Sequence, residues 1–167
     1  IKKITLNPQI IIGSSMGAWI GIRVALKMKK KIKGLITIAA APDFTKSLWE
    51  DVLNKNQKTE ILTKGHIFIP SDYDNEGYII SKNLKENGNK NLILNTSLLK
   101  LNLPIKLLHG EKDKDVNWQR SLEIFNRLKN INTELILIKN GDHRLSNEYN
   151  LKSILKTIKS LISDLLH

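Results

Sequence analysis

The feature that most constrains the fold is the stretch 10–19, where an apolar run meets a Gly-x-Ser-x-Gly motif. Three isoleucines lead into Gly13, Ser15 stands at the centre of the motif, and Gly17 closes it. A helical pattern of apolar residues follows at once, so the spacing predicts a strand, a sharp turn that carries the serine, and a helix. At both glycines we expect that a β-carbon would crowd the neighbouring backbone of this tight turn.

A turn of this kind allows two interpretations of Ser15: a catalytic nucleophile, or a serine without a function. In a nucleophile elbow the serine backbone is strained and its hydroxyl stands clear of the sheet. The N–H of Met16 then lies at the helix N-terminus, where unpaired donors and the helix dipole favour an anion. Met16 is therefore the candidate oxyanion-hole donor. The alternative is a glycine-rich turn in which Ser15 has no function, and residues elsewhere in the chain distinguish the two.

Composition limits the classes of protein that this sequence fits. Its 167 residues suit one domain with a core of its own. No apolar run approaches the roughly 20 residues of a membrane span. The absence of cysteine excludes disulfides, thiolate metal sites and a cysteine nucleophile, and is compatible with a reducing, cytoplasmic compartment. No spacing of His, Asp and Glu suggests a metal site, and no cofactor is expected.

The net charge of +11 raises the alternative of a nucleic-acid binder. The charge comes overwhelmingly from lysines scattered along the chain, and aromatic residues are not interleaved with them for base stacking. Lys, Ile and Asn are abundant together, as the composition of an AT-rich genome would produce. A solvated lysine surface explains the charge better, so we expect no nucleic-acid partner.

Hydrophobic periodicity predicts an α/β fold with a mostly parallel sheet flanked by helices. Strands that are apolar on both faces alternate with amphipathic helices, which is typical of right-handed parallel crossovers. The expected strands are 9–12, 35–41, 105–110 and 133–138, and the expected helices are 15–29, 116–128 and 151–165. Residues 44–103 are less regular, with a helix start at 48–53, an extended piece at 66–70 and a moderate helix over 74–86.

This irregular segment, 44–103, gathers several aromatic residues, Trp49 among them. One interpretation is a small helical lid that lines an apolar substrate pocket. The other is plain helical cover for the sheet. The sequence favours neither over the other.

Three chemistry-bearing residues follow three of the predicted strands. Ser15 follows the first, Asp113 lies in the turn after 105–110, and His143 lies in the turn after 133–138. Because the carboxyl ends of parallel strands meet at one edge of a sheet, we expect the three to converge. His143 is then the base that takes the serine proton, and Asp113 orients the imidazole and stabilises its charged form. The order Ser, Asp, His is that of α/β-hydrolases.

Neighbouring residues compete for these roles. Asp115 is two residues from Asp113, but Asp113 fits the Gly-x-x-Asp-x-x-Val spacing. The side chain of Asp142 should diverge from His143, which makes it a turn residue. His109 is expected to be structural and to shape the turn before Asp113. Two further histidines lack any motif: His66 and His167.

Four segments, 13–19, 39–43, 107–118 and 141–144, resemble the α/β-hydrolases. The resemblance runs nearly the whole chain and is closest to the mitochondrial palmitoyl-protein thioesterase/acyl-glucuronide esterase subgroup and its bacterial relatives. It implies a serine esterase or thioesterase that forms an acyl-enzyme on Ser15 and needs no cofactor. Trp19 and Trp118, in the Ser-x-Gly-x-Trp and Val-x-Trp patterns, and Trp49 are the substrate-binding candidates. Two departures remove no catalytic group: Ala18 stands where glycine is usual, and Asn117 where proline is usual.

The resemblance also implies strands before the elbow, which this sequence lacks. They normally include a His-Gly turn that supplies a second oxyanion-hole N–H, and the loss of one such donor typically costs about 10²–10³ in rate. The uncovered edge of the first strand favours self-association or pairing with a partner chain. We therefore expect 1–167 to be one α/β-hydrolase domain, incomplete at its N-terminus. The alternative function is a catalytically impaired remnant of a split or truncated hydrolase gene.

Overall fold

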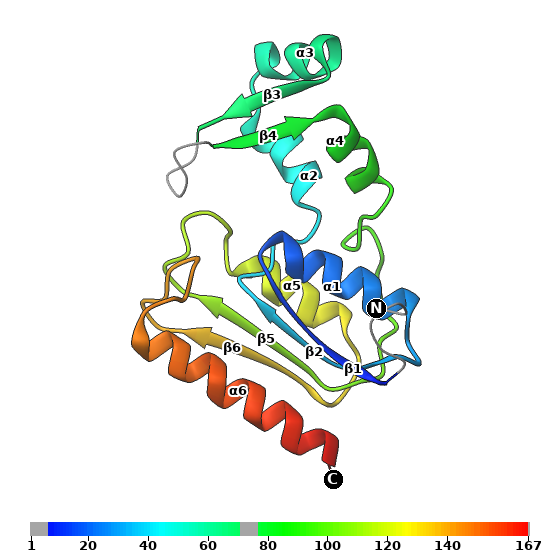
Figure 1. Ribbon diagram of the computed structural model, residues 1–167, viewed down its shortest axis with the longest axis vertical. Helices are drawn as coiled ribbons and strands as arrows, with labels where there is room; N and C mark the ends of the chain where they lie inside the picture. The colour runs from blue at the N-terminus through cyan, green and yellow to red at the C-terminus, as the bar shows by residue number, and fades with distance from the viewer. Residues whose placement is uncertain (1–6, 71–76, 167) are drawn as a thin grey trace. The chain divides into compact units, whose positions relative to one another are not determined.

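The computed structural model describes residues 7–70 and 77–166, which Figure 1 draws as a coloured ribbon. They fall into two compact units. The sheet unit comprises residues 7–42 and 93–166, and the hairpin unit is Asp43–Leu92. The hairpin unit overlaps the expected cover segment 44–103, but residues 93–103 belong to the sheet unit.

The sheet unit is built on four parallel strands in the order β1-β2-β5-β6. They are β1 (Gln9–Ser14), β2 (Ile32–Ile38), β5 (Ile105–Gly110) and β6 (Thr133–Ile138). Every residue of β5 is buried, and so are all residues of β2 except Lys33. Apolar burial on both faces is what a parallel sheet between helix layers requires, and the α/β fold expected from the sequence is confirmed.

Helices cover both faces of this sheet (Figure 1). They are α1 (Met16–Lys27), α5 (Gln119–Arg127) and α6 (Glu148–Leu166). On β2, Ile36 packs in one core cluster with Leu161 of α6, whereas the neighbouring Leu35 lies beside Gly21 of α1. Because successive side chains of a strand point to opposite faces, α6 and α1 lie on opposite sides of the sheet. A β-carbon on Gly34 would lie 2.6 Å from Leu161, so glycine permits this close packing.

Most boundaries in the sheet unit agree with the expectation to within a few residues. The second strand is displaced as a whole, because β2 covers Ile32–Ile38 and not 35–41. Ala39 takes a φ of 47°, a left-handed conformation that ends an extended strand directly after Ile38. Gly34 nevertheless lies within the strand, where it pairs with Ile10 of β1 and packs against Leu161 of α6, and Lys33 stands at a shift in the register.

The hairpin unit combines short helices with a two-stranded antiparallel sheet. Its elements are α2 (Phe44–Ser47), the π-helical turn η1 (Leu48–Val52), α3 (Lys55–Lys64), β3 (His66–Ile69), β4 (Tyr78–Ser81) and α4 (Lys82–Asn89). Five buried side chains form its core: Leu48, Leu53, Ile61, Ile67 and Ile80. These side chains give the hairpin unit a small core of its own.

The helix expected over 74–86 is wrong at Tyr78–Ser81. Residues 74–76 lie outside the described residues, Tyr78–Ser81 is the strand β4, and α4 begins only at Lys82. Ser81 caps this helix, because its Oγ accepts a hydrogen bond from the Leu84 N–H at 3.0 Å. Pairing with β3 through Ile80 and Ile79 outweighs the helical preference of the segment.

Two surface properties follow from this arrangement. Within the part of the chain that the structure describes, no helix has the length and apolar character needed to cross a membrane. Among the same residues, β1 is an edge strand that pairs with β2 alone. Ile10 and Ile12 on this strand are 36% and 48% exposed.

Candidate active site

Ser15 occupies the sharp turn between β1 and α1. Its φ of 52° and ψ of −123° lie outside the regions that an L-residue ordinarily adopts. The tip of β2 holds it there, since the Ser15 N–H donates to the Ile38 carbonyl at 2.8 Å and the Ser15 carbonyl accepts from the Ala41 N–H at 3.1 Å. A strained residue persists where its surroundings fix it on several sides, as they do here.

The two glycines of the motif have different roles. A β-carbon on Gly13 would lie 2.4 Å from the Gly17 carbonyl oxygen, so the turn closes only with glycine at position 13. A β-carbon on Gly17 would meet nothing within 4 Å. The expectation that both positions exclude a β-carbon is therefore correct for Gly13 and wrong for Gly17. The crowding arises because α1 folds back over β1, which brings the backbone of position 17 against position 13.

His143 lies in the loop that follows β6 and joins the other two residues. Its Nε2 is 3.2 Å from Ser15 Oγ, and its Nδ1 is 2.8 Å from Asp113 Oδ2. A carboxylate only accepts hydrogen bonds, so Nδ1 carries the proton and Nε2 accepts from the serine hydroxyl. The structure thus brings Ser15, His143 and Asp113 into one hydrogen-bonded chain across three strand tips.

Backbone contacts between two loops set this geometry. The turn after β5 and the loop after β6 are joined by the Lys112 N–H, which donates to the Gly141 carbonyl at 2.8 Å, and by the Glu111 N–H, which donates to the Ile138 carbonyl at 2.9 Å. A β-carbon on Gly110 would lie 2.4 Å from the Gly141 oxygen. Glycine at the end of β5 therefore permits the two loops to meet.

Asp113 has a fully buried side chain whose two oxygens each accept hydrogen bonds. Oδ1 accepts from the backbone N–H groups of Asp115 and Val116 at 2.9 and 2.8 Å, while Oδ2 accepts from His143 and His109. Burial raises the pKa of this carboxyl, but the hydrogen bonds from the two histidines and from Val116 together outweigh it and hold the pKa well below its usual range. Asp113 is accordingly a buried carboxylate.

The pKa of His143 is raised above its ordinary value of 6.5. The largest cause is the hydrogen bond to Asp113, which burial of the ring opposes, and the negative charges of Asp113, Asp115 and Asp142 add to it. A base whose protonated form is supported in this way is suited to accept a proton and to return it.

The competing aspartates have other contacts. Asp115 is exposed, and its backbone N–H supports Asp113. Asp142 Oδ1 accepts from the Leu145 N–H at 2.8 Å, the contact of a turn residue. Asp113, Asp115 and His143 offer donor atoms within 4.8 Å of one another, a spacing that a metal ion would fit. The hydrogen bonds of Asp113 and His143 already account for their approach.

The remaining candidates are spread over both units. Met16 is the first residue of α1, directly after Ser15. Trp19 is only 4% exposed and belongs to the core of the sheet unit, so it offers little surface to a substrate. Trp118 is half-buried and directly precedes α5. Trp49 belongs to the hairpin unit, where Lys85 Nζ lies 4.3 Å from its ring centroid. His66 is exposed, and His167 lies outside the described residues.

His109 is the contact that sequence reasoning missed. The sequence predicts a structural residue that shapes the turn, yet the fully buried ring places its Nε2 3.0 Å from Asp113 Oδ2. The available signal was its position in a buried strand four residues before the aspartate, which leaves an imidazole little choice of partner.

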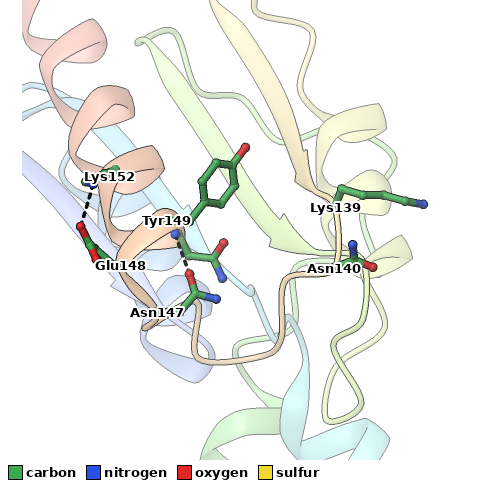
Figure 2. A pocket seen from close by; sticks show the side chains of 7 residues that line it. Lys139, Asn140, Asn147, Glu148, Tyr149 and Lys152 are labelled. Carbon is green, nitrogen blue, oxygen red and sulfur yellow. Dashed lines mark hydrogen bonds and ion pairs between the residues drawn. The ribbon is translucent and has the colours of Figure 1, made fainter.

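An open hollow of about 540 Å³ lies where α6 begins (Figure 2). Its lining includes Lys139, Asn140 and the first turn of α6, but not Ser15, Asp113 or His143. Both of its lysines are ion-paired, Lys152 with Glu148 at 2.7 Å and Lys139 with Glu111. The hollow is thus separate from the serine, histidine and aspartate.

No family model matches the chain, but individual proteins do. The mouse protein named mitochondrial palmitoyl-protein thioesterase ABHD10 is 36% identical over 160 residues, which are 95% of this chain and 53% of that protein. The human protein of the same name is 33% identical over 160 residues, with 52% of that protein covered. The chain spans about half the length of the curated relatives it matches.

Solved structures of hydrolases are also similar to this chain. A putative hydrolase from Agrobacterium vitis superposes with a TM-score of 0.86 at 31% identity, over 92% of this chain and 60% of that one. Mouse ABHD10 gives a TM-score of 0.82 at 34% identity, over 97% and 64% of the two chains. Est1E from Butyrivibrio proteoclasticus gives a TM-score of 0.78 at 17% identity, over 99% and 65%, which shows a shared fold.

Proposed function

We propose that this chain, which has part of the α/β-hydrolase fold, is a serine hydrolase that cleaves an acyl ester or thioester through an acyl-enzyme on Ser15. One observation carries the proposal: His143 contacts both Ser15 Oγ and the buried carboxylate of Asp113. A serine hydroxyl is a poor nucleophile until a neighbouring base takes its proton, and this arrangement supplies the base and its orienting carboxylate.

The reaction proceeds in two halves. Ser15 Oγ attacks the acyl carbonyl carbon while its proton passes to His143 Nε2, and the oxygen that becomes negative accepts a hydrogen bond from the Met16 N–H. Collapse of this intermediate breaks the bond to the leaving alcohol or thiol, which takes the proton from Nε2. Water then attacks the acyl-enzyme, gives a proton to His143, and releases the carboxylic acid as the proton returns to Ser15.

The acyl group and its surroundings are further parts of the proposal. The relatives are named palmitoyl-protein thioesterases, so a long-chain acyl thioester is the first substrate to test. The hairpin unit exposes the cross-strand pair Phe68 and Ile79, which are 56% and 65% exposed. Exposed apolar side chains that lie together often mark a binding surface. This pair supports the proposal that the hairpin unit is a lid that contacts the acyl chain. Trp49, a substrate-binding candidate, belongs to the same unit.

The proposal also covers the cellular compartment and the self-association of the chain. The cysteine-free sequence suits the cytoplasm, whereas the named relatives are mitochondrial, so we propose the cytoplasm only where no organelle signal precedes the sequence. The exposed isoleucines of the edge strand β1 favour association through that edge, which light scattering of the wild type and of Ile12→Lys would measure.

A fluorophosphonate probe tests the nucleophile. We expect the chain to be labelled, Ser15→Ala to lose labelling completely, and Ser14→Ala to keep it. Ser14 is the matched control because it is the adjacent exposed serine at the end of β1. A folded chain that is not labelled, or equal labelling of Ser15→Ala, would contradict the proposal and favour a catalytically impaired protein.

A further inference from the structure

We propose that His109 is a positioning residue of the reaction, which holds the Asp113 carboxylate in place through the same oxygen that His143 uses. The inference rests on the proposed function, because Asp113 must first orient His143. It assigns a second histidine to the site, one that never touches the substrate. The hydrogen-bonded chain Ser15–His143–Asp113 then continues inward. Its fourth member is His109 and its fifth is Ser121.

The contacts of the His109 ring fix where its proton lies. Nε2 is 3.0 Å from Asp113 Oδ2 and 3.0 Å from the Val116 carbonyl oxygen. A carboxylate and a carbonyl only accept hydrogen bonds, so Nε2 must be the donor. Nδ1 of the neutral ring then accepts from the Ser121 hydroxyl at 2.7 Å. Every polar atom of the ring has a partner that suits it in this one tautomer.

Burial makes these hydrogen bonds matter. His109 and Ser121 are both 0% exposed, so water does not replace a lost partner. His109 belongs to β5 and Ser121 to α5, and both elements flank the turn that carries Asp113. The ring therefore ties the turn to the strand before it and the helix after it. The loss of a hydrogen-bond partner costs more free energy at a buried polar group than at one that faces solvent.

The number of donors on Asp113 gives His109 its particular role. A carboxylate offers about four acceptor positions. Two are filled by the Asp115 and Val116 N–H groups on Oδ1, one by His143 and the last by His109 on Oδ2. With all four filled, rotation of the carboxylate about its Cβ–Cγ bond breaks several hydrogen bonds at once. Without His109, His143 alone donates a hydrogen bond to Oδ2. His143 gains and loses a proton during the proposed reaction, so it is a poor anchor for the carboxylate.

Two variants separate positioning from packing. His109→Gln places an amide N–H near the position of Nε2 and can still donate to Asp113. His109→Leu has a similar volume and no donor. Circular dichroism and thermal unfolding establish that each variant is folded.

Two readouts follow the site. The first is the low-field proton resonance of His143 Nδ1–H, which reports its hydrogen bond to Asp113 and needs no turnover. The second is the split between kcat and KM on a p-nitrophenyl acyl ester. For His109→Leu we expect kcat to fall about 10-fold to 100-fold, the scale known for outer partners that orient metal-bound histidines, with KM unchanged. We also expect its low-field resonance to be lost, whereas His109→Gln retains the resonance and most of kcat.

Two outcomes would overturn the proposal. One is a folded His109→Leu protein that keeps both kcat and the resonance. The other is an equal loss in His109→Gln and His109→Leu that follows their loss of thermal stability, because His109 would then only fill space. Failure of the proposed function looks different: the wild type would neither hydrolyse the ester nor be labelled on Ser15, while the resonance would still report whether His109 holds Asp113.

Discussion

The sheet unit and the hairpin unit are built on different principles. The sheet unit buries apolar residues of its strands against helices on both faces, and α6 contributes four apolar side chains to one core cluster: Ile154, Ile158, Leu161 and Leu165. The hairpin unit has a core of five buried side chains beneath two short strands and helices of at most ten residues. Ser15, Asp113 and His143 all come from the sheet unit. The candidate chemistry thus lies on the parallel sheet, and the hairpin unit contributes none of these three residues.

The largest expected effect tests whether the sheet unit holds all of the chemistry. Asp113→Asn should lower kcat by about 10⁴, the scale found when the triad acid of a serine protease is changed in this way. It should also move the acid limb of the pH–rate profile to lower pH, because it removes the largest cause that raises the pKa of His143. In the wild type that limb should lie above 6.5.

The matched control for this experiment is Asp115→Asn, since Asp115 is exposed and lies two residues away. It should leave kcat almost unchanged and shift the limb only slightly downward, because Asp115 contributes charge alone to the pKa of His143. If both variants lose activity equally, Asp113 is not the triad acid.

The second effect separates the stabilities of the two units. Ile61→Ala and Leu107→Ala each remove a fully buried side chain and should cost about 2–5 kcal/mol. Hydrogen exchange should then show opening confined to the hairpin unit in Ile61→Ala, with Ser15 still labelled by a fluorophosphonate. In Leu107→Ala the β5 amides should lose protection and labelling should fall. Opening of β5 in both variants would mean that the two units unfold together.

The third effect concerns the elbow alone. Gly13→Ala should destabilise the chain by about 1–3 kcal/mol and abolish labelling of Ser15, because its β-carbon meets the Gly17 carbonyl. Gly17→Ala places the same methyl group where nothing lies within 4 Å and should be tolerated. Thermal unfolding and probe labelling measure both. Equal damage from the two substitutions would contradict the packing of α1 against β1.

The smallest effect concerns the proposed lid. Trp49→Ala should raise KM for a long-chain acyl substrate by less than about tenfold and leave kcat unchanged, because only a minority of contact residues carry large binding energies. A short-chain acetyl ester serves as the control substrate and should show no change. A large fall in kcat on both substrates would place chemistry in the hairpin unit and remove the distinction between the two.

The same division decides how much of the molecule sequence reasoning could predict. In the sheet unit, apolar runs and the Gly-x-Ser-x-Gly turn identify the strands, and the rule that parallel strands share a carboxyl edge brings Ser15, Asp113 and His143 together. In the hairpin unit, Tyr78–Ser81 is too short to show a period, and its strand exists only because it pairs with β3. Local pattern does not contain a partner that is distant in the sequence.

Lys106 shows the same limit inside the sheet unit. A lysine in a buried strand is expected to reach solvent, yet its side chain is 3% exposed and lies 2.5 Å from Glu134 and 2.8 Å from Asp164. Burial lowers the pKa of this lysine, but the hydrogen bonds to the two carboxylates outweigh burial and leave the pKa raised. Only the register of β6 and the position of α6 show these partners, and neither is written in the residues around Lys106.

The left-handed residues at the strand tips have a consequence for stabilisation of this protein. Ser15 and Ala39 directly follow β1 and β2, Asn140 follows β6, and each has a φ between 47° and 56°. Non-glycine residues in such conformations cost of the order of 1–3 kcal/mol where they are strained. A search for thermostable variants would therefore select replacements at these tips first, and at Ser15 every such gain would remove the proposed nucleophile. Stabilising substitutions are better placed far from these turns, where a gain in stability does not lower activity.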